Sequence, residues 1–380
     1  MKIAFITLGF YPFRASGLDL SGERLVLEMI KLGHQVTVIA GSRGYFKEEI
    51  NKPSLKIIRI PLDKSDWFGF GYRAAKKLSE LESHDIVHFW DVHFGWAYRQ
   101  KFVGSLQHSF QQRINSLGSF SDGSDFNWIV KYSYYTLAKN LLEKPSIDRA
   151  AGLIAGSKTS RDEFIKDYHI QANKIQIARH GVDTDFFTPF KDVRTLRDSL
   201  AINPDEAVII FSGFITPRKG LEYLAQALPD IHPKPKLLLI GRWRSDSYRK
   251  KVMDLLRPFN DQVIELGFVE DQDMPKYYSL ADVYVSSSLL EGFGLPIAEA
   301  LACETPVVAA DSGSTAEVMG PGGILVAQRD PIALAREISK LLQDESLRKD
   351  LGSIGRKYVI DEFSLDSVVK STLDAYEYFA

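Results

Sequence analysis

The sequence predicts an α/β protein with two Rossmann-like, doubly wound domains. Short apolar runs alternate along the chain with segments of helical periodicity, which is the pattern of parallel strands joined by helices. Several of these runs are apolar at consecutive positions, as expected for strands that are covered on both faces. The alternation occurs twice, and the chain of 380 residues is long enough to bury two cores.

The predicted strands form two groups. In the first half they cover Ile3–Thr7, Gln35–Ala40, Leu55–Ile60, Asp85–Phe89, Phe102–Leu106, Gly152–Ala155 and Lys174–Ala178. In the second half they cover Ala207–Ser212, Lys236–Ile240, Gln262–Leu266, Val283–Ser286, Pro306–Ala309 and Ile324–Val326. The pattern breaks at Thr188-Pro189-Phe190-Lys191, so we expect one domain over residues 1–188 and a second over residues 189–362. Residues 363–380 are predicted to form a final helix that no strand follows.

Composition and charge exclude several classes of protein. A formal net charge of −2 provides no field that would gather nucleic acid. No apolar run approaches the roughly 18 residues of a membrane span, and the start of the chain lacks the pattern of a signal peptide. The single cysteine, Cys303, excludes an internal disulfide and a cysteine-based zinc site. We therefore expect a soluble, cytoplasmic protein.

The stretch Ala281–Ser312 carries the strongest functional pattern, ADVYVSSSLLEGFGLPIAEALACETPVVAADS. It is predicted to form a strand, a glycine-bearing loop, a short helix and a second strand. Gly292 and Gly294 allow the backbone to approach a ligand closely, and the N–H groups ahead of a helix bind anions and hydroxyls. Glu291 lies in the loop and Glu299 about one turn into the helix, where an ionised carboxylate can accept two hydrogen bonds from vicinal hydroxyls.

These residues resemble the Glu-x7-Glu signature of the retaining nucleotide-sugar glycosyltransferases of family four, the glycosyl transferases group 1. Further matching motifs cover nearly the whole chain: Gly33-His34-Gln35-Val36-Thr37-Val38, His180-Gly181-Val182-Asp183, Pro217-Arg218-Lys219-Gly220, Thr305-Pro306-Val307-Val308 and Gly322-Gly323-Ile324-Leu325-Val326. The resemblance implies the GT-B fold, in which two Rossmann-like domains face each other across a cleft. It also implies that the helix of residues 363–380 packs back on the N-terminal domain.

The resemblance assigns the donor site to the C-terminal domain. Glu299 would bind the ribose hydroxyls, and Lys219 and Arg218 would neutralise the donor diphosphate. The transferred sugar would be held by Glu291 together with the backbone of Phe293, Gly294 and Leu295. Gly213, the glycine of the second domain's first strand, would also bind the donor, and Val269 would border the nucleobase. Gly17 would approach the phosphates or the acceptor from the first domain.

The same resemblance names His108, at the end of a first-domain strand, as a catalytic residue beside Glu291 and Lys219. Ligands bind at the carboxyl ends of strands in such sheets. His88 and His93 are interpreted as packing residues. Retention would proceed with a donor phosphate oxygen as the base, without a cofactor and without a metal. Accordingly, Asp183-Thr184-Asp185 and Asp271-Gln272-Asp273 are interpreted as a hinge sequence and a helix cap rather than metal sites.

Two positions depart from the family pattern. Phe214 follows Gly213 where the family usually has an arginine, so Arg218 or Arg242 is expected to supply the missing positive charge. Ser16-Gly17 replaces a pair of glycines in the first loop, which leaves less room for a close phosphate. Both departures favour an unusual donor or a low activity.

Aromatic residues are concentrated between positions 67 and 135, and two interpretations remain open. They could pack a core and a long insertion, or they could line an acceptor groove in which flat rings stack on sugar faces. Basic and acidic residues are balanced over this segment, which favours at most a weak peripheral membrane contact.

The expected function is transfer of a hexose from a nucleoside-diphosphate sugar, such as a UDP-sugar or GDP-mannose. The acceptor would be a glycan, a lipid-linked sugar or a small molecule. The alternatives are a nucleotide-sugar epimerase or another enzyme with this fold, and a non-catalytic sugar-binding relative.

Overall fold

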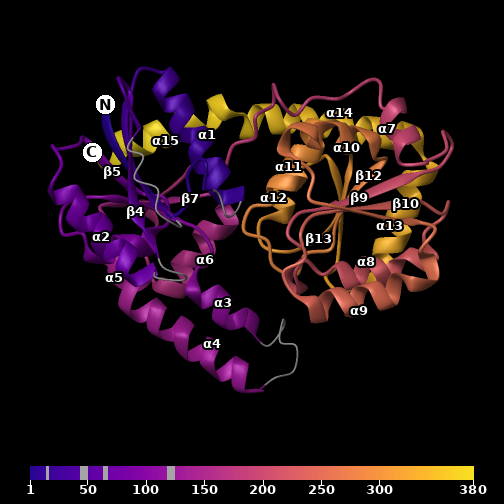
Figure 1. The fold of residues 1–380 in the computed structure, drawn as a ribbon, viewed down its shortest axis with the longest axis horizontal. Coiled ribbons are helices and arrows are strands. Elements are labelled where there is room, and N and C mark those ends of the chain that lie inside the picture. The colour runs from indigo at the N-terminus through magenta and orange to yellow at the C-terminus, as the bar shows by residue number, and fades with distance from the viewer. Residues whose placement is uncertain (14–16, 43–49, 63–66, 118–124) are drawn as a thin grey trace. The chain divides into compact units, whose positions relative to one another are not determined.

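The computed structural model describes residues 1–13, 17–42, 50–62, 67–117 and 125–380, which form two α/β units (Figure 1). Unit 1 comprises Met1–Gly181 and Leu365–Ala380, and unit 2 comprises Val182–Ser364. The expected boundary at residue 188 lies seven residues further along. In the structure Val182 donates a backbone hydrogen bond to the carbonyl of Phe363 at 2.8 Å, so the two chain crossings between the units are adjacent.

Unit 1 is built on an eight-stranded sheet with the order β3-β4-β2-β1-β5-β6-β7-β8. Its strands are β1 (Lys2–Thr7), β2 (Gln35–Ser42), β3 (Ile50–Lys52), β4 (Leu55–Pro61), β5 (Ile86–Phe89), β6 (Val103–Leu106), β7 (Gly152–Ala155) and β8 (Ile175–Ile177). All neighbours are parallel except β3, which pairs antiparallel with β4.

Helices cover both faces of this sheet. They are α1 (Gly17–Lys31), α2 (Trp67–Ser79), α3 (Phe110–Ser116), α4 (Asp125–Ala138), a π-helix (Lys139–Glu143), α5 (Lys144–Arg149), α6 (Lys158–Tyr168) and α15 (Leu365–Phe379). Alternate residues of β1 point to opposite faces. Ile3 and Phe5 pack with α1 and α15, whereas Ala4 and Ile6 pack with α2, α5 and α6.

Unit 2 contains a six-stranded, wholly parallel sheet with the order β11-β10-β9-β12-β13-β14. Its strands are β9 (Val208–Ser212), β10 (Lys236–Ile240), β11 (Val263–Gly267), β12 (Val283–Ser286), β13 (Val307–Ala310) and β14 (Gly323–Val326). Its helices are α7 (Arg194–Ser199), α8 (Leu221–Ala227), α9 (Asp246–Leu256), α10 (Met274–Leu280), α11 (Leu295–Ala302), α12 (Thr315–Met319), α13 (Pro331–Gln343) and α14 (Glu345–Phe363). Separate cores lie on its two faces.

The predicted fold class is confirmed in each unit. Every predicted strand is present, with ends that differ by at most two residues. One strand of the structure, the short antiparallel edge strand β3, was not predicted. An edge strand has a neighbour on one side only, so three residues suffice and no long apolar run marks them.

Candidate active site

Three adjacent strands of unit 2 end in glycines with left-handed backbone angles. Gly213, Gly241 and Gly267 follow or end β9, β10 and β11, with φ of 120°, 139° and 66°. The N–H of Gly213 donates to Ile240 at 3.0 Å, and that of Gly241 donates to Gly267 at 2.6 Å. A Cβ on Gly241 would lie 1.8 Å from the carbonyl oxygen of Gly213. Glycine therefore lets the backbones meet at the carboxyl edge of the sheet.

The loop after β9 packs closely against the loop after β12 and is hydrogen-bonded to it. Pro217–Lys219 form a 3₁₀ turn that ends at Gly220, where a Cβ would lie 2.2 Å from the carbonyl oxygen of Ser287. The N–H of Leu289 donates to the carbonyl of Arg218 at 2.8 Å. The Ser287 hydroxyl donates to the carbonyl of Lys219 at 3.2 Å. These bonds hold the two predicted diphosphate ligands beside the β12 loop.

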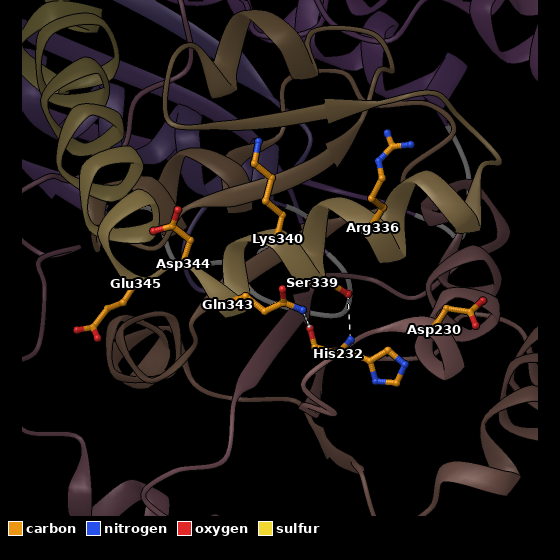
Figure 2. A pocket seen from close by; sticks show the side chains of 8 residues that line it. All are labelled: Asp230, His232, Arg336, Ser339, Lys340, Gln343, Asp344 and Glu345. Carbon is orange, nitrogen blue, oxygen red and sulfur yellow. Dashed lines mark hydrogen bonds between the residues drawn. The ribbon is translucent and has the colours of Figure 1, made fainter.

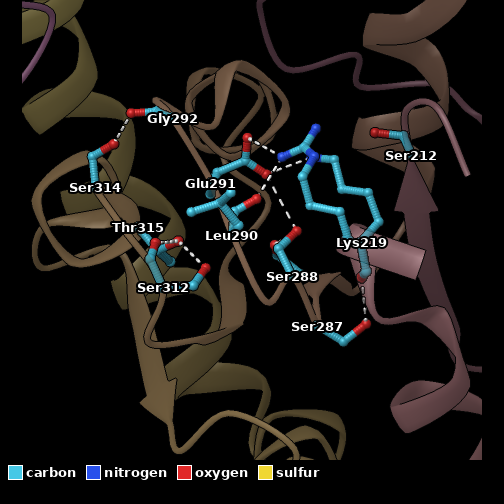
Figure 3. A network of polar contacts seen from close by, with 12 residues as sticks. Ser212, Lys219, Ser287, Ser288, Leu290, Glu291, Gly292, Ser312, Ser314 and Thr315 are labelled. Carbon is cyan, nitrogen blue, oxygen red and sulfur yellow. Dashed lines mark hydrogen bonds and ion pairs between the residues drawn. The ribbon is translucent and has the colours of Figure 1, made fainter. Parts of the chain in front are cut away.

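Lys219 and Glu291, 72 residues apart, form a buried ion pair between Nζ and Oε2 (Figure 3). The same carboxylate oxygen accepts a hydrogen bond from the Ser288 hydroxyl at 3.2 Å, and its other oxygen lies 3.7 Å from a terminal nitrogen of Arg218. Burial lowers the pKa of the Lys219 ammonium, and the charge of Glu291 opposes this shift. The structure thus gathers two cations and one carboxylate at a single point.

The backbone around Glu291 is fixed by the loop after β13. A Cβ on Gly313 would lie 2.0 Å from the carbonyl oxygen of Glu291. Ser314 donates from its N–H to that oxygen at 3.4 Å and from its hydroxyl to the carbonyl of Gly292 (Figure 3). The β12 loop is therefore held from both neighbouring strands.

Gly294 lies directly before α11, at the N-cap position of that helix. Its φ is 97°, Leu295 is the first helical residue, and Pro296 occupies the first turn. The side chain of Phe293 is buried, with its ring 5.4 Å from that of Phe363 and at 80° to it. The side chain of Phe293 therefore packs in the hydrophobic core, and only its backbone is available to a ligand.

Glu299, on α11, accepts a hydrogen bond from Tyr278, a residue that no sequence motif predicted. The hydroxyl of Tyr278 donates to Glu299 Oε2 at 3.1 Å, and it lies 3.0 Å from the hydroxyl of Ser212 at the end of β9. Tyr278 is buried, and burial together with the Glu299 charge raises its pKa well above the ordinary value. No motif marks this tyrosine, because on an amphipathic helix it is indistinguishable from a core residue.

The exposed arginines at the carboxyl edge of unit 2 lie over aromatic rings. The guanidinium of Arg242 is 4.3 Å from the ring centre of Phe268, next to Val269, which packs partly against the core. That of Arg244 is 4.0 Å from the ring centre of Phe214, the residue that departs from the family pattern. Arg218 and Arg242 were the two residues expected to replace the positive charge that the family usually has at position 214. Arg218 lies beside the carboxylate of Glu291, whereas Arg242 lies over the ring of Phe268.

His108 and Gly17 belong to unit 1. His108 follows β6, and its neighbour Gln107 is bonded to Nε2 of His180 at 3.1 Å and donates to the carbonyl of Trp90 at 3.0 Å. His180 is buried, which lowers its pKa to about 4. Gly17 is the first residue of α1, whereas Ser16 lies outside the described residues.

His88 and His93 are buried in unit 1, in keeping with their interpretation as packing residues. His88 lies 2.7 Å from both the Tyr376 hydroxyl and the Ser105 hydroxyl, and burial lowers its pKa to about 3. His93 Nδ1 is 2.6 Å from a carboxylate oxygen of Asp91.

Comparison with known proteins identifies the family. The model of Glycosyltransferase Family 4 matches residues 17–186, and that of Glycosyl transferases group 1 matches residues 192–358. The O-antigen chain mannosyltransferase B of Escherichia coli is 30% identical over 281 residues, which cover 72% of each chain. The chain belongs to the group 1 glycosyltransferases.

Other relatives of this glycosyltransferase extend over its whole length. An uncharacterized glycosyltransferase of Methanocaldococcus jannaschii is 27% identical over 401 residues, which cover 99% of this chain and 98% of the relative. Two solved structures share its fold: sucrose-phosphate synthase of Thermosynechococcus elongatus (TM-score 0.78, 22% identity, 99% and 98% coverage) and Anabaena HepE in complex with UDP and glucose (TM-score 0.79, 20% identity, 99% of each chain). The predicted GT-B fold is confirmed.

The Asp-x-Asp sequences of the glycosyltransferase have local structural roles. Asp183 accepts a hydrogen bond from the N–H of Phe186 at 3.0 Å, and Asp273 pairs with Lys276 at 3.0 Å. Within the described ranges, no cluster of three or more His, Cys, Asp or Glu side chains could hold a metal. Among those same residues, no helix is long and apolar enough to cross a membrane.

A surface hollow of about 800 Å³ lies elsewhere in unit 2, before the amino end of β10 (Figure 2). It is lined by Asp230, His232, Arg336, Ser339, Lys340, Gln343, Asp344 and Glu345. His232 bonds through its backbone to Ser339 at 2.9 Å and to Gln343 at 2.8 Å. Its lining includes none of the predicted site residues, and it carries charges of both signs, so we do not assign it to the donor.

Proposed function

We propose that this glycosyltransferase transfers a hexose from a nucleoside-diphosphate sugar to a carbohydrate or lipid-linked acceptor, with retention at the anomeric carbon. The observation that carries the proposal is the cluster of Lys219, Arg218 and Glu291 beside the start of α11. Fixed cations and helix N–H groups stabilise the charge that grows on a leaving diphosphate. The likeness to Anabaena HepE, whose structure contains UDP and glucose, supports the same class of donor.

In this proposal Lys219 changes partner when the donor binds. Its ammonium moves from Glu291 to the diphosphate, and the released carboxylate accepts hydrogen bonds from the hexose hydroxyls. The backbone of Phe293, Gly294 and Leu295 binds the same sugar. The exchange replaces one charge-assisted bond by another, so neither buried charge is left without compensation.

The remaining donor contacts follow from the positions of the residues. Glu299 binds the ribose hydroxyls, with its orientation set by Tyr278. Gly213 allows the phosphates to approach the end of β9, since the nearest atom to a Cβ at this position is Lys219 Cε at 4.0 Å. Val269 borders the nucleobase, and Arg218 shares the diphosphate with Lys219.

The proposed chemistry uses no metal and no protein nucleophile. Glu291 and Glu299 bind hydroxyl groups of the donor, so neither carboxylate acts as the nucleophile or the base. A phosphate oxygen of the donor instead takes the proton of the acceptor hydroxyl, on the face of the sugar from which the diphosphate leaves. His108, from unit 1, stabilises the charged transition state, and Gly17 approaches the phosphates or the acceptor. We place the reaction in the cytoplasm, in line with the single thiol of Cys303.

The test uses water as an acceptor, because the natural acceptor is unidentified. UDP-glucose or GDP-mannose is incubated with the enzyme, and NMR records the first anomer released, with and without a chelator. The α-anomer, formed equally with the chelator, is expected from these α-linked donors. A β-anomer, or activity that is lost with the chelator and restored by a divalent metal, would falsify the mechanism. A new nucleotide sugar formed from the donor alone would indicate an epimerase.

A further inference from the structure

The loop after β10 continues the pairing of β9 and β10 beyond the ends of both strands. The N–H of Ile215 donates to the carbonyl of Arg242 at 3.0 Å, and the N–H of Arg244 donates to the carbonyl of Ile215 at 3.1 Å. Ile215 and Trp243 therefore form an isolated parallel bridge. Side chains of an extended chain alternate between its two faces. Accordingly, Arg242 and Arg244 are exposed, whereas Trp243 packs partly against the core of unit 2.

Arg244 is held in position by its neighbours on both sides. The indole N–H of Trp243 donates to the carboxylate of Glu265 at 2.6 Å, and Ser245 is the N-cap residue of α9. The guanidinium of Arg244 lies 4.0 Å from the ring centre of Phe214. Stacking occupies one flat face of a guanidinium and leaves the N–H groups along its edge available. Arg244 is therefore a fixed cation whose edge is accessible to a ligand.

Within the ranges that the structure describes, no carboxylate oxygen lies within 4.0 Å of the guanidinium nitrogens of Arg244. Glu265, the acidic residue below this loop, pairs instead with Arg249 at 3.0 Å. Lys219, by contrast, is paired with Glu291. An anion that binds Arg244 therefore displaces only water, and the charge-assisted hydrogen bonds it gains contribute directly to affinity.

The charges at the proposed diphosphate site leave room for a further cation. Lys219 and Arg218 bring two positive charges, and Glu291 brings one negative charge. The cluster therefore has a single net positive charge, whereas both phosphates of a nucleotide sugar are ionised. A third fixed cation beside the cluster would neutralise the remaining phosphate charge.

Arg244 lies at the end of the strand that carries this cluster. Phe214 directly follows Gly213 at the end of β9, and a Cβ on Gly213 would lie 4.0 Å from Cε of Lys219. In the sheet β9 is also the neighbour of β12, whose loop contains Glu291 (Figure 1). Lys219 and Arg244 are therefore both held where β9 ends, the first beside Gly213 and the second over the next side chain.

We propose that Arg244 binds the diphosphate of the donor as this third cation, an inference that rests on the proposed function. The ring of Phe214 does not carry the charge that the family usually has at this position, but it supports a guanidinium that comes from the neighbouring loop. The planar fork of an arginine can donate two hydrogen bonds to one phosphate. Arg242 is less suitable, because it lies over Phe268, which follows β11, and β10 separates β11 from β9.

Calorimetric titration of the whole chain with UDP and with GDP tests the contact. Arg244→Ala should weaken binding of the nucleoside diphosphate by roughly ten- to a hundredfold, the effect of hydrogen bonds to a charged group. Binding of the matching nucleoside, uridine or guanosine, should be unchanged because it has no phosphate. Adding Phe214→Arg to Arg244→Ala returns a guanidinium to the residue after Gly213 and should restore most of the affinity.

The matched control is Arg257→Ala. Arg257 is exposed and paired with Asp254, and it follows α9 at the opposite edge of the sheet, where the chain returns to the start of β11. This variant should bind both diphosphates like the parent. Circular dichroism verifies the fold of every variant.

Glu299→Ala separates this inference from the proposed function. If Glu299→Ala weakens diphosphate binding and Arg244→Ala does not, the donor site stands and Arg244 is not part of it. If neither variant weakens binding, the proposed donor site is itself wrong. An equal loss of nucleoside binding in Arg244→Ala would place this arginine at the base. A double variant as weak as Arg244→Ala would show that the site does not lack a guanidinium, and either result overturns the inference.

Discussion

The hydroxyl of Tyr278 donates a hydrogen bond to Oε2 of Glu299 at 3.1 Å and lies 3.0 Å from the hydroxyl of Ser212. These three residues come from α10, α11 and the end of β9. The orientation of Glu299, which we propose binds the ribose, is therefore set by contacts with residues that are distant in the sequence. Because the tyrosine is buried, its hydroxyl cannot turn to water for an alternative partner.

We expect Tyr278→Phe to weaken donor binding by about fivefold, the effect of one hydrogen bond of about 1 kcal/mol. Glu299→Ala should weaken it further. Both should spare kcat, since ribose contacts exist equally in the ground and transition states. Calorimetric titration with the nucleoside diphosphate measures the affinity. Tyr358→Phe, which removes a hydroxyl bonded to the carbonyl of Glu317 at 2.8 Å, is the control. Unchanged affinity in folded Glu299→Ala would remove this residue from the donor site.

Lys219→Ala should lower kcat far more than it changes donor affinity. Loss of one group that stabilises developing negative charge typically costs roughly 2.7–4 kcal/mol, or about a hundred- to a thousandfold in rate. Rates of donor hydrolysis, measured at saturating donor, give the effect. Lys251→Ala, which removes an exposed lysine paired with Glu222 at 3.5 Å, should leave the rate unchanged. Near-normal turnover of the Lys219 variant would transfer its role to Arg218 or Arg242.

The glycines at the carboxyl edge of unit 2 should differ sharply in their tolerance of a Cβ. Gly267→Ala meets no atom within 4 Å and should cost about 1–2 kcal/mol for its left-handed backbone. Gly241→Ala meets the carbonyl oxygen of Gly213 at 1.8 Å and should cost more than about 4 kcal/mol. Urea unfolding of both variants measures the difference. Similar urea midpoints for the two variants would mean that the ends of β9 and β10 can move apart to accommodate the Cβ.

The stability of unit 1 should depend on pH through Glu143. This side chain is buried, where it accepts hydrogen bonds from the Tyr168 hydroxyl and from the N–H of Phe110 at 2.9 Å. Burial raises its pKa from 4.5 to about 7, against the opposing effects of these bonds and of the nearby His93. The folded state therefore holds a proton that the unfolded state releases, and stability is lost as the pH rises from about 4.5 to 7.

Glu143→Gln abolishes this titration. Relative to the variant, the parent should lose up to about 3 kcal/mol of unfolding free energy between pH 4.5 and pH 7 and little above that. Urea unfolding followed by tryptophan fluorescence provides the measurement. Trp243→Phe in both proteins confines the signal to unit 1, since the other four tryptophans lie there. A constant difference across this range would show that Glu143 titrates normally.

Local sequence patterns were enough to predict most of the strands and the loop that carries the main motif. Consecutive apolar residues marked every strand of both sheets except β3, because burial on both faces leaves a local pattern. The motif from Glu291 to Glu299 located a loop and a helix N-terminus, because turn glycines and a first-turn proline act over a few residues. Family membership followed from the order of such local motifs.

The contacts between side chains that are distant in the sequence could not be predicted in this way. Lys219 pairs with Glu291 across 72 residues, and Gln107 bonds to His180 across 73. Such contacts depend on the order of the strands in the sheet and on the packing of the loops. The periodicity of apolar residues along the sequence contains no information about either. The aromatic segment shows the same limit: Phe70 and Phe94 are core residues, whereas Trp128 and Tyr132 are exposed. Aromatic residues with the same spacing along the sequence are buried where another helix or strand covers them and exposed where none does. Which of them are covered depends on the fold as a whole.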